Sequence, residues 1–338
     1  MSRLTEQEAL KLFYDAPLQE LQKAAHAKRS EKFSADQATY IVMRIVSYTN
    51  ICIADCKYCA FYRSPGDKEG YVLSHETIFQ KIDELLQKNG TLVAMEGGFN
   101  PELKMDHYEN LFMAVRKKYG ERIEIYGPTP VEVLFIARNS KITLQETLMR
   151  LKEAGLRWIP GGGAEILTKE WRQKLSPKKY SVEQYLETVE AAQNLGFGTT
   201  ATMVIGFGES YEARVEHLKH LRDLQNKTNG FASFLCWTYQ TSNTEWGGDI
   251  TSNEDYLRTL AISRLYLDNI PHIRTSFLTQ GANAPVSLLY GADDFDIPLE
   301  DQVTQQAGVV IENNMDPLLA EVTKLGLKPV QRNPWRQL

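Results

Sequence analysis

Apolar residues along this chain follow two kinds of spacing. Short runs rich in Val, Ile and Thr are separated by polar stretches in which apolar residues recur every three or four positions. The runs are typical of buried strands, and the spaced stretches of amphipathic helices. The strand candidates are Thr39–Tyr48, Leu92–Met95, Ile123–Tyr126, Arg157–Pro160, Thr199–Phe207, Ala232–Tyr239, Ile273–Thr279 and Gly291–Phe295. The helix candidates are His75–Lys88, Asp106–Lys118, Leu144–Ala154, Val182–Leu195, Tyr211–Gln225 and Asn253–Asp268.

The alternation of these elements predicts the fold. Strands that alternate with helices of this length form a parallel sheet, and seven or eight such units favour a closed barrel over an open sheet. We therefore expect an α/β fold of the (β/α)8 TIM-barrel type, with a doubly wound sheet as the alternative. Two short amphipathic helices, broken near Pro17, precede the first strand. The expected organisation is a helical lead-in over 1–36 and a barrel domain over 37–338 with a C-terminal helical extension.

Composition and charge narrow the classes of function. Of the 338 residues, 43% are hydrophobic and 24% charged, as in an ordinary globular protein. The net charge of −5 comes without a dense basic arm, so nucleic acid is not an expected partner. No segment approaches the roughly 18 unbroken apolar residues of a membrane helix, and the N-terminus lacks the apolar core of a signal peptide. We expect a cytoplasmic protein that does not bind membranes.

Three of the four cysteines lie together, in the order Cys52, Cys56 and Cys59. This CxxxCxxC spacing lets one loop wrap three thiolates around a single iron–sulfur cubane, and it leaves one iron open to a small molecule. The alternatives are a zinc site or cysteines without metal, although zinc usually takes paired CxxC motifs or a nearby histidine. Cys236 lies on an apolar strand, and we interpret it as an inert buried thiol.

Glycine and carboxylate residues recur at the C-terminal ends of other predicted strands. They form the segments Glu96-Gly97-Gly98, Gly161–Glu165 and Val204–Glu209. Catalytic groups of (β/α)8 barrels sit at this end of the strands, as the cysteine loop after the first strand also would. Glycine there permits positive φ and lets a ligand approach the backbone. Any single glycine pair is equally a strand-to-helix turn, so the hypothesis of a cofactor site depends on their joint position.

These motifs together resemble the radical S-adenosylmethionine (SAM) superfamily. The resemblance implies that Cys52, Cys56 and Cys59 hold a [4Fe-4S] cluster whose open iron binds SAM. One-electron reduction then cleaves SAM to methionine and a 5′-deoxyadenosyl radical. By the same resemblance the SAM-binding residues are Tyr58 and the backbone of Ile205 and Gly206 near adenine, Glu96, Gly97 and Gly98 facing the SAM ammonium, and Glu165 at the ribose.

Longer strings resemble a narrower family, the dehypoxanthine futalosine cyclases of menaquinone biosynthesis. They include Tyr48–Asn50, Ala60–Arg63, Gly70–Ser74, Pro160–Leu167, Thr199–Met203 and Trp237–Gln240. This resemblance implies cyclisation of a nucleoside-like substrate by the adenosyl radical, with an electron donor such as flavodoxin or ferredoxin. The candidate substrate contacts are Arg63, Trp237, Gln240 and Asp294.

The sequence leaves the substrate open. Glu96 stands where this family more often has Gln, and Cys236, 126–130 and 291–298 also depart from its pattern. The alternatives are therefore an aminofutalosine synthase-like enzyme, a deazaflavin (F0) synthase-like enzyme or a paralogue with another substrate. A non-catalytic iron–sulfur or zinc protein is the alternative from another class. The oligomeric state is not predicted.

Overall fold

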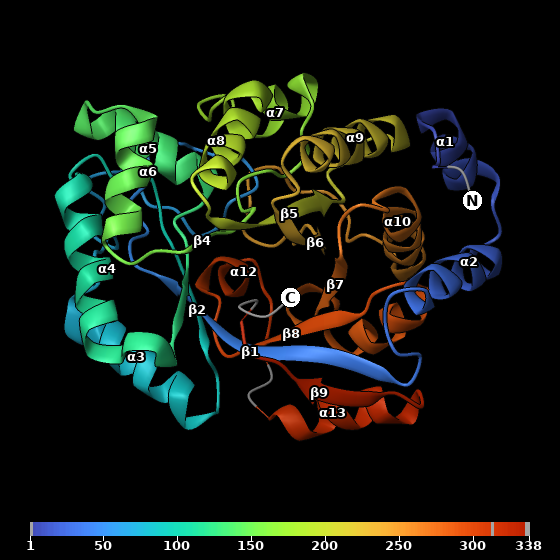
Figure 1. The fold of residues 1–338 in the computed structure, drawn as a ribbon. Helices are drawn as coiled ribbons and strands as arrows, with labels where there is room; N and C mark the ends of the chain where they lie inside the picture. Colours follow the sequence, from blue (N-terminus) through green and yellow to red (C-terminus); the bar gives the residue numbers. More distant parts are fainter. Residues whose placement is uncertain (1–2, 312–313, 335–338) are drawn as a thin grey trace.

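Eight parallel strands close into a barrel (Figure 1). The structure is a computed structural model that describes residues 3–311 and 314–334. The first strand pairs with both the second and the eighth, which closes the sheet and confirms the (β/α)8 barrel against the doubly wound alternative. The barrel strands are β1 (Gln37–Ser47), β2 (Leu92–Glu96), β3 (Glu124–Tyr126), β4 (Trp158–Ile159), β5 (Gly198–Ile205), β6 (Phe231–Thr238), β7 (His272–Ser276) and β8 (Asp294–Pro298).

Helices surround the barrel and connect its strands (Figure 1). Most begin at a Ser or Thr whose hydroxyl accepts a hydrogen bond from the first turn, as at Ser74, Ser181 and Ser252. They are α3 (His75–Gln87), α4 (Met105–Tyr119), α5 (Pro130–Ser140), α6 (Leu144–Glu153), α7 (Lys169–Leu175), α8 (Val182–Asn194), α9 (Tyr211–Thr228), α10 (Asn253–Tyr266) and α11 (Phe277–Gln280). Two 3-10 helices, η1 (Gly120–Arg122) and η2 (Gly281–Tyr290), complete the connections.

Alternating side chains of β1 divide the core into two layers. Ile41, Met43 and Ile45 belong to the same buried cluster as Tyr126 and Trp158, whose stacked rings lie 5.2 Å apart. Their neighbours in β1, Val42 and Val46, instead pack with the apolar faces of α3 and α4. The period of two is that of a strand with both faces covered, and each buried aliphatic side chain contributes roughly 1.5–3 kcal/mol.

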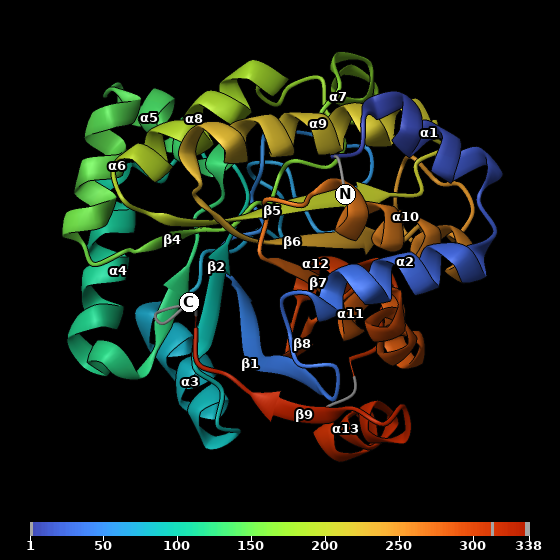
Figure 2. The same ribbon diagram turned by 45° about the vertical axis from the view of Figure 1, so that its right-hand side comes forward.

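The N-terminal helices lie on the outside of the barrel. Helices α1 (Glu6–Asp15) and α2 (Leu18–Ser30) pack against α9, α10 and η2 (Figure 2). Pro17 separates them, as the sequence predicts. The predicted domain boundary falls directly before β1, which begins at Gln37, and it stays a prediction. No helix in the described ranges is both long and apolar enough to cross a membrane.

The C-terminal part differs from the predicted helical extension. Besides α12 (Gln302–Gln306) and α13 (Met315–Lys324), it contains a ninth strand, β9 (Lys328–Gln331). This strand pairs in parallel with the first residues of β1, from Gln37 to Tyr40 (Figure 2). The pairing of β1 with β2 begins later in the strand, at Met43. The edge of β1 that the short β2 does not reach is thereby covered.

Candidate functional site

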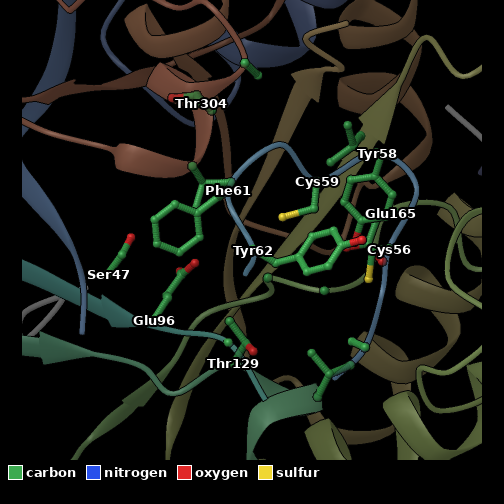
Figure 3. A pocket seen from close by; sticks show the side chains of 18 of the residues that line it. Ser47, Cys56, Tyr58, Cys59, Phe61, Tyr62, Glu96, Thr129, Glu165 and Thr304 are labelled. Atoms are coloured by element: carbon green, nitrogen blue, oxygen red, sulfur yellow. The ribbon is translucent and has the colours of Figure 1, made fainter. Parts of the chain in front are cut away.

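A cavity opens at the C-terminal ends of the barrel strands (Figure 3). Its lining comes from β1, β2, β5 and β6, from the loops after β1, β2, β4 and β6, from the start of α5 and from the segment around α12. Ten residues that the sequence assigned to a site line this cavity. They are Cys52, Cys56, Tyr58, Cys59, Glu96, Gly97, Gly98, Glu165, Trp237 and Gln240.

The three clustered cysteines lie on one loop after β1. The sulfur of Cys52 accepts hydrogen bonds from the backbone N–H groups of Ala54 and Phe99, at 3.4 and 3.2 Å. The backbone N–H of Cys59 donates to the carbonyl of Cys56 at 3.0 Å, which closes a tight turn between these two cysteines. All three are free thiols facing the cavity. Backbone hydrogen bonds within the loop and from Phe99 after β2 therefore hold the loop, and its sulfur atoms are available for ligation.

The glycine pair after β2 makes room for this loop. A Cβ on Gly98 would lie 2.8 Å from the Cβ of Cys52, and one on Gly97 would lie 2.6 Å from the ring of Tyr48. Neither glycine has a positive φ. Positive φ is therefore not the reason for glycine here, since a Cβ at either position would collide with the protein itself. Both glycines line the cavity, and a ligand's approach to their backbone stays a prediction.

A buried ionic network surrounds Tyr58, the residue before Cys59. The hydroxyl of Tyr58 donates to a carboxylate oxygen of Glu165 at 2.6 Å, and the Lys179 ammonium lies 2.7 Å from the hydroxyl and 3.0 Å from that carboxylate oxygen. Arg172 donates to the other carboxylate oxygen at 2.9 Å. Burial opposes ionisation, but the charges of Lys179 and Arg172 outweigh it and lower the pKa of Glu165. Tyr58 and Glu165 are therefore held in fixed positions beside the cysteines.

A second buried carboxylate fixes the end of β2. Glu132, in the first turn of α5, accepts hydrogen bonds from the Gly97 N–H at 2.8 Å and from the Thr129 N–H at 2.9 Å. The hydroxyls of Tyr48 and Thr129 donate to it as well. Four donors thus converge on one side chain, which ties α5 to the end of β2.

Glu96 differs from these two carboxylates. Burial, followed by the charges of Glu132 and Asp301, raises its pKa to about 8, although Lys179 lowers it. Part of its surface is exposed, but this surface faces the cavity (Figure 3). A side chain with this pKa is mostly a neutral carboxylic acid at pH 7, and it then has one hydrogen to donate as well as oxygen atoms that accept.

The end of β5 and the residues after it, Val204–Phe207, lie beside the cavity without lining it at the predicted positions. Ile205 is buried, and the N–H groups of Gly206 and Phe207 donate to the carboxylate of Glu209, at 3.0 and 2.8 Å. Val204 of the same segment does line the cavity, and the ring of Phe207 lies edge-on to that of Tyr58 at 5.6 Å. The role of Ile205 and Gly206 at the adenine stays a prediction.

Two predicted substrate contacts lie outside the cavity. Arg63 pairs with Glu69 at 2.7 Å and is not among the residues that line the cavity. Asp294 is fully buried at the start of β8, where it pairs with Arg274 at 2.8 Å and with Arg332 at 2.6 Å. The predicted eighth strand, Gly291–Phe295, begins three residues before the observed one, Asp294–Pro298. This shift puts Asp294 at the N-terminal end of the barrel rather than at the rim.

Sequence reasoning missed several residues that line or support the cavity. Lys179 follows no recognisable motif, and only the folded chain brings it to Tyr58, 121 positions earlier. Asp301, before α12, lies in a segment to which no role was assigned. Glu132 had a detectable signal, since Thr129 and Glu132 form a capping box at the start of α5. No pattern in the sequence indicated the hydrogen bond between Glu132 and the Gly97 N–H.

The three thiols fit a [4Fe-4S] cluster chemically. No group of three or more His, Cys, Asp or Glu side chains among the described residues is placed to hold one metal ion, whereas a cubane binds each thiolate at a different iron. Burial raises the pKa of all three thiols, to about 12 for Cys56, and the Lys179 charge opposes this. Bare thiolates are therefore disfavoured here, and a cationic cluster would stabilise them.

Two family models together match most of the chain. The radical SAM superfamily model matches residues 46–221, and the model of the CofH/MqnC C-terminal region matches residues 228–337. The first match contains the cysteine loop and Glu165. The second contains α12 and β9.

Curated proteins resemble the chain over nearly its whole length. The cyclic dehypoxanthine futalosine synthase of Halalkalibacterium halodurans is 40% identical over 98% of this chain and 90% of that protein. The enzyme of the same name from Streptomyces coelicolor is 39% identical over 98% of this chain and 84% of that protein. Aminodeoxyfutalosine synthase of Thermus thermophilus is 34% identical, over 90% and 84% respectively.

A solved structure supports the barrel independently. Methylornithine synthase superposes with a TM-score of 0.75 over 97% of this chain and 95% of that one, at 18% identity, so this likeness concerns the fold alone. The family models and the curated relatives cover both the cysteine loop and the C-terminal segment. The chain therefore belongs to the radical SAM superfamily of enzymes, in the family that carries the CofH/MqnC C-terminal region and includes the cyclic dehypoxanthine futalosine synthases.

Proposed function

We propose that this enzyme cyclises dehypoxanthine futalosine to cyclic dehypoxanthine futalosine in the futalosine route to menaquinone. The observation that carries the proposal is the cavity, which joins the three cysteine thiols to a wall of polar and aromatic side chains at the barrel rim. The identity to two synthases that carry this activity in their names, at 40% and 39%, supports the choice of substrate.

The residues divide into groups with different tasks. Cys52, Cys56 and Cys59 would hold the [4Fe-4S] cluster that this family uses, and Tyr58 and Glu165 beside them are placed to contact SAM. When bound, the cluster supplies the electron that cleaves SAM to the radical which removes a hydrogen from substrate. A buried site of this kind keeps water away from the reacting carbon.

The remaining lining suits a substrate that contains a ring. Trp237 lies in the wall formed by β6, and the amide of Gln240 is held by the carbonyl of Thr238 at 3.0 Å. An aromatic side chain and an oriented amide suit a planar ring and a polar substituent. We propose both as substrate contacts, together with a small-protein electron donor such as flavodoxin or ferredoxin. The free cysteines support a reducing compartment such as the cytoplasm.

Anaerobic assay of the reconstituted enzyme tests the proposal. Reduced protein supplied with SAM and dehypoxanthine futalosine should release 5′-deoxyadenosine and the cyclised product, both identified by mass. The Cys56→Ala variant, which lacks one cluster ligand, should form neither. A wild-type protein that contains four irons but never cleaves SAM would refute the radical chemistry. About one zinc without labile sulfide would favour the non-catalytic alternative.

The same assay separates the related substrates. Aminodeoxyfutalosine synthase is a relative at 34% identity whose name indicates a different reaction. SAM cleavage that depends on the substrates of such relatives, without turnover of dehypoxanthine futalosine, would assign this chain to one of those reactions instead.

A further inference from the structure

Two polar side chains without partners lie next to each other at the cavity wall. Ser47 ends β1 and Glu96 ends β2, and they are direct neighbours in the pairing of these strands. The Ser47 hydroxyl is buried, with 3% of the residue exposed, and has no hydrogen-bond partner in the described part of the chain. The Glu96 carboxyl likewise has no hydrogen bond or ion pair there, although the backbone carbonyl of Glu96 accepts from the Tyr48 N–H at 3.1 Å. Figure 3 shows both beside Phe61, on the opposite side of the cavity from Cys56 and Tyr58.

The other carboxyl groups near this pair are already engaged. Glu132 accepts hydrogen bonds from four donors, and Asp301 accepts from the Val303 N–H at 3.0 Å and the Thr304 hydroxyl at 2.8 Å. The neighbouring cation, Lys179, is bound to Glu165. A buried polar group without a partner destabilises the folded chain, because its hydrogen bonds to water are lost and not replaced. Two such groups side by side, facing a cavity, are therefore explained best by a ligand that completes them.

Gly162 lies beside this carboxyl and lines the same cavity. A Cβ on Gly162 would lie 2.6 Å from the side chain of Thr129 and 3.7 Å from an oxygen of Glu96. Packing against Thr129 therefore requires a glycine here, and its lack of a side chain also leaves the Glu96 carboxyl uncovered on the cavity side.

The surroundings restrict the chemistry of the ligand. The carboxylates of Glu132 and Asp301 repel a substrate anion. A protonated Glu96 offers both a donor and an acceptor, and so does the Ser47 hydroxyl. Adjacent hydroxyl groups of a sugar match these paired functions, since each hydroxyl also donates and accepts.

We propose that Ser47 and Glu96 form a subsite that binds neighbouring sugar hydroxyls of the substrate. The assignment of that sugar to the ribose-derived part of dehypoxanthine futalosine rests on the proposed function. The subsite lies on the wall of β1 and β2, so it would hold the sugar on the side of the cavity that faces the SAM contacts Tyr58 and Glu165 (Figure 3). This role differs from the SAM-ammonium contact that the sequence resemblance implies for Glu96.

Substrate binding should depend on pH through this carboxyl. Burial and the charges of Glu132 and Asp301 favour its neutral form, whereas Lys179 opposes them. A substrate that covers the carboxyl removes its remaining water and favours the neutral form further. Affinity should therefore fall as Glu96 ionises above pH 8, by about tenfold between pH 7 and pH 9.

The test uses the reconstituted holoenzyme with SAM, and dehypoxanthine futalosine and its singly deoxygenated sugar analogues as probes. Glu96→Ala and Ser47→Ala should each raise the substrate KM about tenfold, the factor expected for one lost hydrogen bond. Glu96→Gln keeps a donor and an acceptor, so it should restore the affinity and abolish the fall above pH 8. At least one deoxygenated analogue should bind wild type about tenfold more weakly, yet bind Glu96→Ala as well as the parent does.

Several outcomes would overturn the subsite. A changed SAM dissociation constant in Glu96→Ala with an unchanged substrate KM would assign Glu96 to SAM. Equal affinity of wild type for the parent and every deoxygenated analogue would remove the hydroxyl contacts. Calorimetry separates this inference from the proposed function: binding of dehypoxanthine futalosine without turnover refutes the function alone, whereas absence of binding refutes both.

Discussion

Replacing Glu132 by Gln tests whether this buried carboxylate holds the end of β2 in place. Glu132 is 4% exposed, and its two oxygens share four donors. A Gln side chain has the same shape but only one accepting oxygen, and its NH2 group donates. The hydroxyls of Tyr48 and Thr129 can rotate to accept from that NH2 group. The backbone N–H groups of Gly97 and Thr129 cannot.

The magnitude follows from this count of donors. Whichever way the amide is oriented, one backbone N–H, that of Gly97 or that of Thr129, faces the NH2 group. A buried N–H left without a partner costs about 1–3 kcal/mol, to which the loss of charge-assisted bonds is added. Burial raises the pKa of Glu132, so a neutral side chain also relieves part of the cost of burying charge. We expect Glu132→Gln to lower the free energy of unfolding by about 2 kcal/mol.

Equilibrium unfolding in urea at pH 7, followed on cluster-free protein by far-UV circular dichroism, measures this change. Glu8→Gln is the matched control, because Thr5 and Glu8 form the same capping box on the exposed helix α1. Its midpoint should hardly move, since water replaces the lost bonds there. Equal midpoints for the two variants, or an unchanged midpoint for Glu132→Gln, would refute the reasoning that burial makes these hydrogen bonds obligatory.

Three further changes probe other parts of the site and the barrel. Gly98→Ala brings a Cβ to 2.8 Å from the cysteine loop and should lower the iron and labile sulfide bound per chain, measured after reconstitution. Lys179→Met removes the charge that lowers the pKa of Glu165 most. The ionised Glu165 stabilises the fold above its unfolded pKa, and this stabilisation is lost as pH falls through its folded pKa. Because the variant raises that folded pKa, its acid unfolding should begin at higher pH. Arg332→Ala removes one of the two arginines paired with the buried Asp294 and should cost about 2 kcal/mol by urea unfolding, because Arg274 still pairs with the carboxylate; an unchanged midpoint would refute it.

Most of the barrel could be predicted from the sequence because hydrophobic periodicity is a local property. Each strand and most helices between β1 and α10 were found near their observed bounds. Helix α5 was missed because Pro128 and Pro130 indicate a turn, whereas Pro130 stands in the first turn of a helix, where it needs no N–H partner. Strand β9 was missed because its four residues are half-exposed and carry no clear alternation.

The candidate site was predictable only where one short segment carries its chemistry. The cysteine spacing is contained in one loop, so sequence alone identified the three thiols that face the cavity. Lys179 and Glu132 depend on pairings across many positions, which no local pattern encodes. Asp294 was predicted near the C-terminal end of the eighth strand, at the barrel rim. Strand β8 begins three residues later than predicted, so Asp294 lies at the N-terminal end of the barrel instead.

The pairing of β9 with β1 also concerns how the protein is made. Residues Gln37–Tyr40 leave the ribosome before the other barrel strands, but their partner Lys328–Gln331 follows only after all of those strands have been made. Until then the edge of β1 at Gln37–Tyr40 presents backbone N–H and C=O groups without partners, which can pair with strands of other chains. A nascent chain stalled before Lys328 should therefore expose a template for aggregation that the finished protein lacks.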